Sequence, residues 1–450
     1  MLNQAFIELM RRQMGAEAER LVGALTAEGA EPVSVRLNPD KPYTAPEGKA
    51  VDWCASGRYL PSRPSFTLDP HFQAGAYYVQ EASSMFVGEL LMQVAGPIEQ
   101  GLRLLDMCAA PGGKATLYSS VIGGKGIVVA NEVIRQRAAV LADNVQRWGL
   151  GNTVVCSDDP SHFAALGGWF DAVAVDAPCS GEGMFRKNPE ARAEWSLENV
   201  KLCAARQKRI LADAWAALKE GGVLIYSTCT FNRAENEDNM EWLSEQFDCI
   251  RTDIEIPAEW NIVRTRAGEA ECFRFFPHLT RGEGLFAAVV RKGGSSARAK
   301  TPRPRRKPFG EPNRNTLKEA SRWVTKGTVL KTVGDMLYAY PEMLWEDQRA
   351  VCEQMTAIYS GTRMGQVFGR TLKPDHALAL SVLLDRSAAP EAGLTVEEAL
   401  RYLRRQELSS VGQLAEGINL LLFEEQPIGW TKRIGQRTNN LMPKELRILQ

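Results

Sequence analysis

The sequence has no excess of charge of either sign, because 54 Lys and Arg residues balance 54 Asp and Glu residues over 450 positions. A net charge of zero creates no global field that would attract a polyanion, so nucleic-acid binding has to rely on local basic patches. No stretch of 18 uninterrupted apolar residues occurs, which excludes a long apolar membrane helix. Near the start, Glu8 interrupts the apolar stretch and Arg11 and Arg12 follow it. This order is the reverse of a secretory signal, so we expect a cytoplasmic protein.

Cysteines are few and isolated. There are nine of them, an odd number, and no two lie within four residues of each other. This spacing argues against a disulfide framework and against a zinc knuckle, and we expect no metal site. In a reducing compartment such thiols are either small core residues or chemical reagents. They are Cys54, Cys108, Cys156, Cys179, Cys203, Cys229, Cys249, Cys272 and Cys352.

Short apolar runs alternate with helical stretches through the middle of the chain. The chain length favours two or three domains, and the 44% of residues that are hydrophobic suffice for a sizeable core. The alternation predicts a parallel β-sheet covered by helices on both faces. The runs are residues 102–105, 126–130, 153–156, 170–175, 223–227 and 285–290.

One intervening helix is easy to recognise. Ser196 can cap it, and Gly221 with Gly222 is expected to end it and to begin the next strand. An apolar stripe at three- and four-residue steps marks its buried face: Leu197, Val200, Ala204, Leu211, Trp215 and Leu218.

The residues that follow each strand matter most, because ligands of an open parallel sheet bind beyond the carboxyl ends of its strands. The first strand leads into Asp106 to Lys114, a turn of small residues that opens a helix and suits close backbone contact with a ligand. A phosphate loop is excluded, because position 108 is Cys and Lys114 is followed by Ala115.

The second and third strands end in acidic residues. Glu132 lies about 20 residues after the turn, a spacing that suits hydrogen bonds to ribose hydroxyls. After the third strand, Asp158 and Asp159 offer an acceptor for an adenine amino group, with a surface turn as the alternative reading.

Strands four and five each place a thiol where substrates gather. Asp176-Ala177-Pro178-Cys179 follows one strand, and Cys229 follows the other. A thiolate that adds to carbon 6 of cytosine makes carbon 5 able to accept a methyl group, so covalent catalysis is the chemistry that such thiols favour. Asp176 could hydrogen-bond the base, and Lys114 could stabilise the thiolate.

The segment from 291 to 307 is basic. It holds eight Lys or Arg residues and no acid, which fits either a flexible linker or a contact with RNA phosphates. Residues 316–450 then resume a globular composition, with a helix expected over 395–403.

Three segments together resemble a known family, the Sun-type RNA cytosine-5 methyltransferases, and within it the bacterial small-subunit rRNA methyltransferase F type. They are 106–114, 176–183 and Ser227-Thr228-Cys229. The resemblance extends to residues 32–39, 75–85 and 429–447, almost the whole chain. It implies an α/β fold: a doubly wound, seven-stranded, Rossmann-like methyltransferase core with an antiparallel last strand.

The resemblance also implies a division of the chain. The expected regions are an N-terminal RNA-binding extension (1–94), the methyltransferase domain (95–293), a basic linker (294–315), an intermediate domain (316–388) and a PUA-like RNA-binding module (389–450).

The family pattern further implies the role of each site residue. Cys229 attacks carbon 6, Cys179 promotes release, and Asp176 serves both the reaction and the cofactor. The residues implied for S-adenosylmethionine are Cys108, Ala109, Ala110, Pro111, Gly112, Gly113, Lys114, Glu132, Asp158 and Asp176. The choice of Asp158 over Asp159 rests on spacing alone.

The expected partner is RNA, with 16S rRNA favoured and a monomeric enzyme expected. A transfer-RNA cytosine-5 methyltransferase stays open as an alternative. A non-catalytic ribosome-assembly factor is another, although the intact turn and both thiols argue against it. The turn at Asp176 has neither the aromatic motif of an amino-group methyltransferase nor a ribose enzyme's lysine-centred set.

Overall fold

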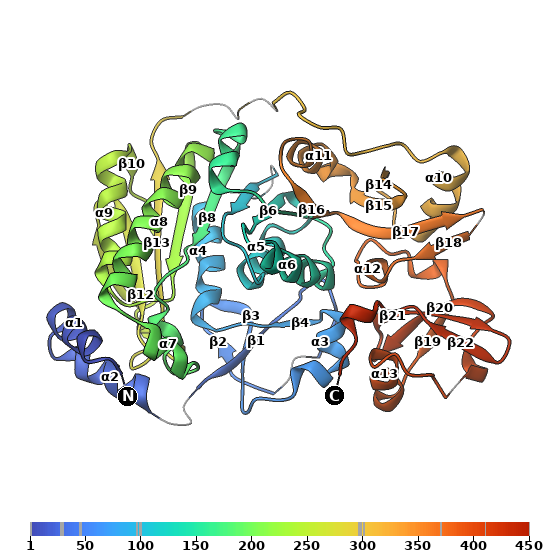
Figure 1. Ribbon diagram of the computed structural model, residues 1–450, viewed down its shortest axis with the longest axis horizontal. Helices are drawn as coiled ribbons and strands as arrows, with labels where there is room; N and C mark the ends of the chain where they lie inside the picture. The colour runs from blue at the N-terminus through green and yellow to red at the C-terminus, as the bar shows by residue number, and fades with distance from the viewer. Residues whose placement is uncertain are drawn as a thin grey trace.

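A ten-stranded sheet forms the centre of the molecule, with a small sheet before it and two more after it (Figure 1). The computed structural model describes residues 2–27, 31–44, 47–95, 98, 101–295, 299, 302–369, 371–409 and 411–449. No helix among these residues is long and apolar enough to cross a membrane. All nine cysteines are described and all are free thiols.

The N-terminal region divides into a helical pair and a four-stranded sheet. The helices α1 and α2 pack near α7, where the Phe6 ring lies 5.2 Å from that of Phe185 and 5.5 Å from that of Trp195. In the sheet, β1 pairs with both β3 and β4. Residues 32–39 and 75–85, two of the segments that carry the family resemblance, therefore lie side by side. The elements are α1 (Gln4–Met14), α2 (Glu17–Thr26), β1 (Val33–Leu37), β2 (Ala50–Val51), β3 (Cys54–Leu60), α3 (Pro70–Ala74), β4 (Tyr77–Val79) and α4 (Phe86–Val94).

The central sheet contains five parallel strands, in the order β7-β6-β5-β8-β9, followed by β13, which runs antiparallel to β9. This arrangement confirms the expected doubly wound core with an antiparallel last strand. The strands are β5 (Arg103–Asp106), β6 (Ile127–Asn131), β7 (Thr153–Cys156), β8 (Phe170–Asp176), β9 (Leu218–Thr228), β12 (Ala270–Phe275) and β13 (Leu285–Lys292).

Helices cover both faces of this sheet because its strands are apolar on both sides. Leu104 packs with α4, α5 and α6 on one face, whereas its neighbour Leu105 packs with α8, α9 and α11 on the other. The helices of the core are α5 (Gly113–Ile122), α6 (Arg135–Trp148), α7 (Pro189–Glu194), α8 (Leu197–Ala217) and α9 (Glu237–Gln246).

Two details of the expected helix differ from the structure. Ser196 caps α8 as expected, its side chain accepting a hydrogen bond from the Asn199 amide. Leu197, however, is 40% exposed, because the buried stripe begins only at Val200. The helix ends at Ala217, before the glycines, since Leu218 is already extended; Gly221 and Gly222 therefore lie inside β9.

The sheet has ten strands, three more than the seven that the resemblance implies. Four of the ten lie outside the six apolar runs of the sequence: β12, β10 (Cys249–Ile250), β11 (Val263–Ala267) and β16 (Ala357–Ser360). The last of them comes from the expected intermediate domain, yet it pairs antiparallel with β7 and completes that edge of the core sheet. Part of the region 316–388, namely β16 and α11, is thus built into the core, whereas β14, β15, β17 and β18 form a sheet of their own.

The C-terminal half contains two further four-stranded sheets. The helix expected over 395–403 is confirmed as α13, capped by Thr395. The elements are α10 (Arg314–Ala320), β14 (Thr328–Val333), β15 (Met336–Pro341), α11 (Trp345–Gln354), β17 (Thr362–Phe368), β18 (Thr371–Pro374), α12 (His376–Ala379), β19 (Glu391–Gly393), α13 (Val396–Leu403), β20 (Gly417–Phe423), β21 (Gln426–Ile434) and β22 (Arg437–Asn440).

The basic segment has more than one environment. Arg291 and Lys292 bind backbone carbonyls beside β9, namely those of Gly221, Trp215 and Leu218 among others. The amides of Arg305 and Arg306 donate to the Glu353 carbonyl at 3.2 and 3.1 Å, so this part lies against α11. Arg298 and Lys300 lie outside the described residues.

The two C-terminal sheets share one hydrophobic core. Trp323, before β14, packs edge-on against Trp430 of β21 at 5.7 Å, and the Trp430 indole donates to the Asp375 carbonyl at 2.9 Å. We therefore expect Trp430→Ala to lower the free energy of unfolding by about 3–5 kcal/mol in a denaturant titration. Phe368→Ala is the control, because Phe368 is 60% exposed. If the two substitutions lowered the free energy of unfolding equally, the shared core would contribute no stability.

Candidate active site

A cavity of about 840 Å³ opens at the carboxyl edge of the parallel strands. The turns after β5, β6, β8 and β9 line one side, and the exposed face of α8 lines another. Its lining residues are Met107, Cys108, Ala110, Asn131, Glu132, Val133, Ile134, Arg137, Asp159, Pro160, Asp176, Ala177, Pro178, Cys179, Gly181, Met184, Arg206, Arg209, Ile210, Asp213 and Cys229.

The turn after β5 presents only part of its length to the cavity. Cys108 and Ala110 line it, whereas Ala109, Pro111, Gly112 and Gly113 support the turn. The Ala109 amide donates to the Asn131 carbonyl at 2.8 Å, which ties this turn to β6. Gly112 has a φ of 115°, and a Cβ there would lie 3.1 Å from the Leu141 side chain. This position therefore favours glycine.

Lys114 and Asp176 form an ion pair at the bottom of the site. The Lys114 Nζ lies 2.9 Å from Asp176 Oδ1, which also accepts the Ser227 hydroxyl at 2.8 Å. Burial alone would lower the pKa of Lys114, but Asp176 and Cys229 reverse the effect and raise it. The positively charged Lys114 thus lies beside the carboxylate of Asp176, at the end of β8, and near the thiol of Cys229, which follows β9.

Asp106, the last residue of β5, is fully buried. Neither of its carboxyl oxygens accepts a hydrogen bond within bonding distance from a described residue. Burial and the nearby Asp176 raise its pKa to about 8, against the opposing effect of Lys114. Its surroundings therefore favour the protonated form of the carboxyl group.

The acidic residues after β6 and β7 occupy different environments. Glu132 lines the cavity, where its carboxylate accepts the Ile134 amide at 2.9 Å and pairs with Arg137 at 3.2 Å. Asp158 does not line the cavity; its carboxylate accepts the amide and hydroxyl of Thr356, at 2.6 and 2.9 Å. Its neighbour Asp159 does line the cavity.

The two thiols meet. Cys179 Sγ and Cys229 Sγ are 3.3 Å apart, because their loops follow the paired strands β8 and β9. The hydrogen bond to Cys229, burial and the negative charge of a Cys229 thiolate together raise the pKa of Cys179 well above its usual value. These effects favour the protonated form of Cys179, and the two sulfur atoms are close enough to share a hydrogen bond in either direction. The third lining thiol, Cys108, also has its pKa raised by burial.

Several lining residues were not foreseen from the sequence. Arg206 and Arg209 lie on the exposed face of α8, where arginines look like an ordinary solvated helix surface. Val133, Ile134 and Met184 are about half exposed apolar side chains at the cavity. No spacing rule marks the two arginines, because only the packing of α8 beside the strand ends brings them to the site.

Comparison with known proteins extends these observations. Residues 94–291 match the family described as 16S rRNA methyltransferase RsmB/F. Residues 2–82 match the N-terminal domain of 16S rRNA methyltransferase RsmF, and residues 390–448 match the methyltransferase RsmF PUA domain. These matches agree with the expected N-terminal extension and PUA-like module.

Individual relatives cover most of the chain. The ribosomal RNA small subunit methyltransferase F of Erwinia tasmaniensis is 32% identical over 414 residues, which cover 88% of this chain and 84% of the relative. The protein of the same name from Salmonella heidelberg is 33% identical over 419 residues, with the same two shares. A crystal structure of a methyltransferase homologue from Pyrococcus horikoshii is 28% identical, with a TM-score of 0.55 over 64% of this chain and 95% of that one.

The fold and the cavity define a methyltransferase of the S-adenosylmethionine-dependent class. Within that class, the chain belongs to the 16S rRNA methyltransferase RsmB/F family. The resemblance drawn from its motifs is thereby confirmed.

The residues present fit S-adenosylmethionine. The cavity volume lies within the range of small-molecule sites, and the turn of small residues leads into the start of α5. A carboxylate at Glu132 and apolar side chains at Val133 and Ile134 suit a ribose and an adenine ring. Cys108, Ala110, Glu132 and Asp176 are the sequence-expected cofactor residues that line this space.

The raised pKa of Asp106 should be visible in the pH dependence of stability. Between about pH 4 and 8 the folded protein holds a proton that the unfolded chain releases, so stability is present at low pH and is lost as the pH rises toward 8. Asp106→Asn cannot ionise. From about pH 5 to 7, the free energy of unfolding of the unmodified protein should fall relative to this variant by about 1.4 kcal/mol per pH unit. Urea titrations at three pH values measure the difference; a constant difference would mean that Asp106 is ionised in the fold.

Proposed function

We propose that this protein transfers a methyl group to carbon 5 of a cytosine in 16S rRNA, with Cys229 as the nucleophile and Cys179 as the residue that assists release. The observation that carries this function is the pair of thiols, 3.3 Å apart, at the ends of two adjacent parallel strands. A single buried thiol is usually structural, but two that face one cavity beside Lys114 and Asp176 form a covalent catalytic set.

The addition step uses the Cys229 thiolate. Its sulfur forms a bond to carbon 6 of cytosine, and the electron pair released from the carbon 5–carbon 6 double bond makes carbon 5 nucleophilic. Lys114 stabilises the thiolate before attack. Asp176 Oδ1 is bound by Lys114 and Ser227, so Oδ2 is the oxygen left to hydrogen-bond the polar edge of the base. When bound, S-adenosylmethionine supplies an electrophilic methyl group to carbon 5.

Release needs a base that takes the proton from carbon 5 while the bond between carbon 6 and Cys229 breaks. The causes that raise the pKa of Cys179 include the hydrogen bond to Cys229 and the charge on Cys229, and both disappear once Cys229 is bonded to the base. Cys179 then loses its own proton to solvent more readily and accepts the proton from carbon 5. Cys229 leaves as a thiolate, which restores the starting state.

For S-adenosylmethionine we assign the turn from Cys108 to Lys114, together with Glu132 and Asp176. For the adenine amino group, Asp159 is a better candidate than Asp158, because Asp159 lines the cavity while Thr356 occupies the Asp158 carboxylate. Asp159 keeps its negative charge, since hydrogen bonds from Ser161 lower its pKa.

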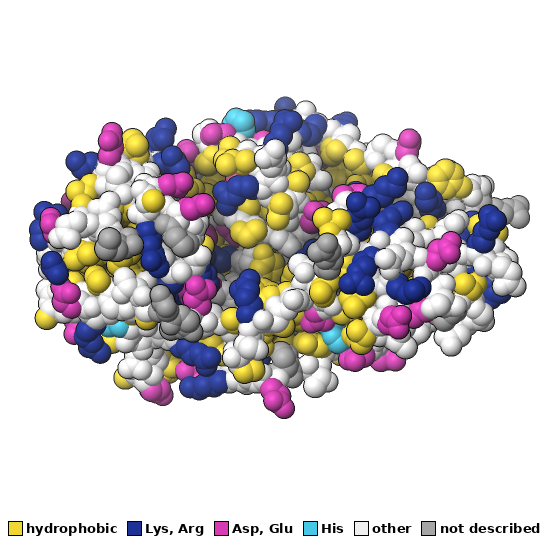
Figure 2. All heavy atoms as spheres, turned by 60° about the horizontal axis from the view of Figure 1, so that its bottom comes forward, with side chains coloured by type: hydrophobic (Ala, Val, Ile, Leu, Met, Phe, Trp, Pro, Cys, Tyr) yellow, Lys and Arg dark blue, Asp and Glu magenta, His cyan; other side chains and the backbone are white. Residues whose placement is uncertain are grey.

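We assign the methyl-transfer reaction to residues 95–293 and RNA binding to residues 1–94 and 389–450. The matches to an RsmF N-terminal domain and to an RsmF PUA domain support this division. Figure 2 shows Lys and Arg side chains in local groups on one face of the molecule, including a group over the C-terminal half, rather than as a continuous basic surface.

A target nucleotide in a helix must be unstacked to enter the cavity, at a cost of a few kcal/mol. Arg206 and Arg209 at the cavity suit its phosphates.

Ribosomal RNA is favoured over transfer RNA because the relatives that span the chain are named small-subunit rRNA methyltransferases. We further propose that the enzyme acts as a monomer. A ribosomal substrate also favours action in the cytoplasm. Bisulfite mapping of 16S rRNA with and without the gene identifies the modified nucleotide.

Substitution of each thiol tests the assigned roles. Cys229→Ala should abolish both methylation and the covalent protein–RNA adduct, because Cys229 supplies the sulfur that attacks carbon 6. Cys179→Ala should let the adduct accumulate, because addition survives while release is impaired. Denaturing gel electrophoresis with labelled RNA and cofactor measures both. If the Cys179 variant lost the adduct while the Cys229 variant kept it, the two roles would be reversed; if both variants methylated RNA normally, thiol catalysis would be wrong.

A further inference from the structure

Two buried glutamates lie behind the thiols, outside the cavity lining. Glu182 belongs to the loop of Cys179, after β8, and Glu235 belongs to the loop of Cys229, after β9. Both side chains are completely buried. A buried carboxylate is costly unless hydrogen bonds satisfy it, so the partners of these two residues show what they do in the fold.

Glu182 binds the backbone of the other loop. Its Oε2 accepts the amides of Phe231 and Asn232 at 2.6 and 3.0 Å. Its Oε1 accepts the Trp195 indole at 3.0 Å and the Asn232 side-chain amide at 2.9 Å. The amide of Gly183, the next residue, donates to the Cys229 carbonyl at 2.7 Å. The Cys179 loop thereby fixes the backbone of Cys229 and of the residues that follow it.

Glu235 makes the reciprocal contact. Its Oε2 accepts the amide of Ser180, the residue after Cys179, at 3.0 Å, and its Oε1 accepts the Ser180 hydroxyl. Gln207 of α8 donates to Glu235 at 2.8 Å and to the Pro178 carbonyl at 3.0 Å. Cys179 is therefore held on both sides, through the residue before it and the residue after it.

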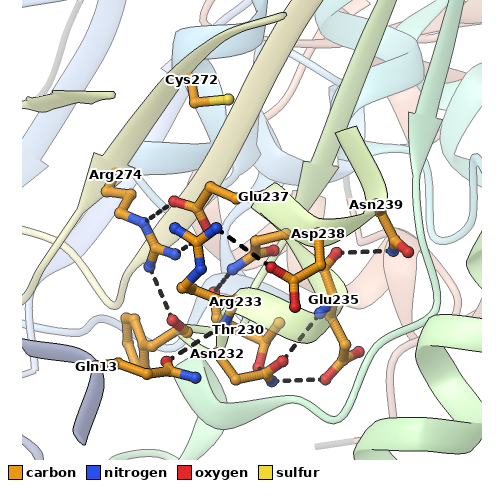
Figure 3. Close-up of polar contacts among 12 residues, drawn as sticks. Gln13, Thr230, Asn232, Arg233, Glu235, Glu237, Asp238, Asn239, Cys272 and Arg274 are labelled. Atoms are coloured by element: carbon orange, nitrogen blue, oxygen red, sulfur yellow. Dashed lines mark hydrogen bonds and ion pairs between the residues drawn. The ribbon is translucent and has the colours of Figure 1, made fainter. Parts of the chain in front are cut away.

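Asn232 joins the two carboxylates. Its side-chain amide donates to Glu182 at 2.9 Å and to Glu235 at 2.8 Å, and its carbonyl oxygen accepts the Glu235 amide at 3.0 Å. Figure 3 shows Asn232 and Glu235 directed toward one another, with the Arg274–Glu237 ion pair beside them. The hydroxyls of Ser180 and Thr230, the residues that follow the two thiols, are 3.0 Å apart. Each glutamate thus has four hydrogen-bond donors, in a network that spans both loops.

We propose that Glu182 and Glu235 are positioning residues that hold the two catalytic thiols in register, Glu235 by fixing Cys179 and Glu182 by fixing Cys229. These roles rest on the proposed function of the thiols. Neither glutamate lines the cavity, so neither contacts the substrate or the cofactor. Both act through the loop opposite their own.

Because each glutamate binds the loop opposite its own, substitutions of the two glutamates should slow different steps of the reaction. Glu235→Gln replaces one acceptor oxygen with an amide group that faces donors, so the Ser180 contacts weaken and Cys179 is displaced. Glu182→Gln weakens the contacts to Phe231 and Asn232 and displaces the Cys229 loop instead. Since small displacements of a reacting group slow a step strongly, we expect each variant to lose about tenfold to a hundredfold in its own step.

Single-turnover reactions with 16S rRNA fragments and labelled S-adenosylmethionine test this difference. For Glu235→Gln we expect adduct formation at nearly the normal rate and slow release, so the adduct accumulates. For Glu182→Gln we expect slow addition and no accumulation. The dissociation constant for S-adenosylmethionine should be unchanged in both. The control is Glu271→Gln, which removes an equally buried carboxylate from β12, bound there by Arg264 and Arg266, and should leave both steps unchanged.

A second measurement tests position without catalysis. Diamide, a two-electron oxidant, removes a proton and an electron from each of Cys179 and Cys229 and links their sulfurs. Tryptic mapping gives the rate of this link. The rate should fall at least about fivefold in both glutamate variants and stay unchanged in Glu271→Gln. Ser180→Ala, which keeps the backbone contact to Glu235 but removes the hydroxyl, should show a smaller fall and covers the case that Glu235→Gln does not fold.

The outcomes are distinguishable. If folded glutamate variants react with diamide and form and release the adduct as the unmodified protein does, the positioning roles are wrong. If both variants slow the same step equally, or bind S-adenosylmethionine more weakly, the carboxylates have only a general structural role. If the diamide rates change as expected while Cys229→Ala still methylates RNA, the positioning holds and the proposed chemistry fails.

Discussion

The parallel pairing of β8 with β9 is the constraint on which the site depends. Their register sets Asp176 opposite Ser227, so the loops that follow leave the sheet side by side at the same edge. Cys179 and Cys229, which are 50 positions apart in sequence, therefore come within 3.3 Å of each other. An antiparallel or non-adjacent pair of strands would send these loops to different places, and Cys229 would then not raise the pKa of Cys179.

Charge is distributed unevenly in this site, and the distribution defines the roles of its groups. Lys114 and Asp176 form an ion pair near the thiols, whereas burial and the nearby Asp176 raise the pKa of Asp106 to about 8. Behind the thiols, Glu182 and Glu235 are buried among hydrogen-bond donors and face away from the ligand space. Some acidic side chains thus line the cavity and others are buried behind it, and the hydrogen-bond donors around each one differ accordingly.

The C-terminal half is joined to the catalytic core more closely than a tethered RNA-binding module would be. β16 extends the core sheet at β7, and Thr356, just before it, binds Asp158 at the end of that strand. The shared core around Trp323 and Trp430 joins the two C-terminal sheets to each other. Packed structure therefore connects the C-terminal half to the end of β7, after which Asp159 and Pro160 line the cavity.

The sequence by itself determined the sheet, the strand-end turns and the identity of both thiols. Buried parallel strands are short apolar runs, and ligand-binding residues follow them directly, so local patterns predict both. It could not predict β16 in the core sheet, the enclosure of the Asp158 carboxylate by Thr356, or the place of Arg206 and Arg209 at the cavity. Each of these depends on residues distant in sequence that meet only after the chain has packed. Only the tertiary structure decided which acidic side chains line the cavity, because burial and contacts with hydrogen-bond donors, rather than residue type, determine where each side chain lies.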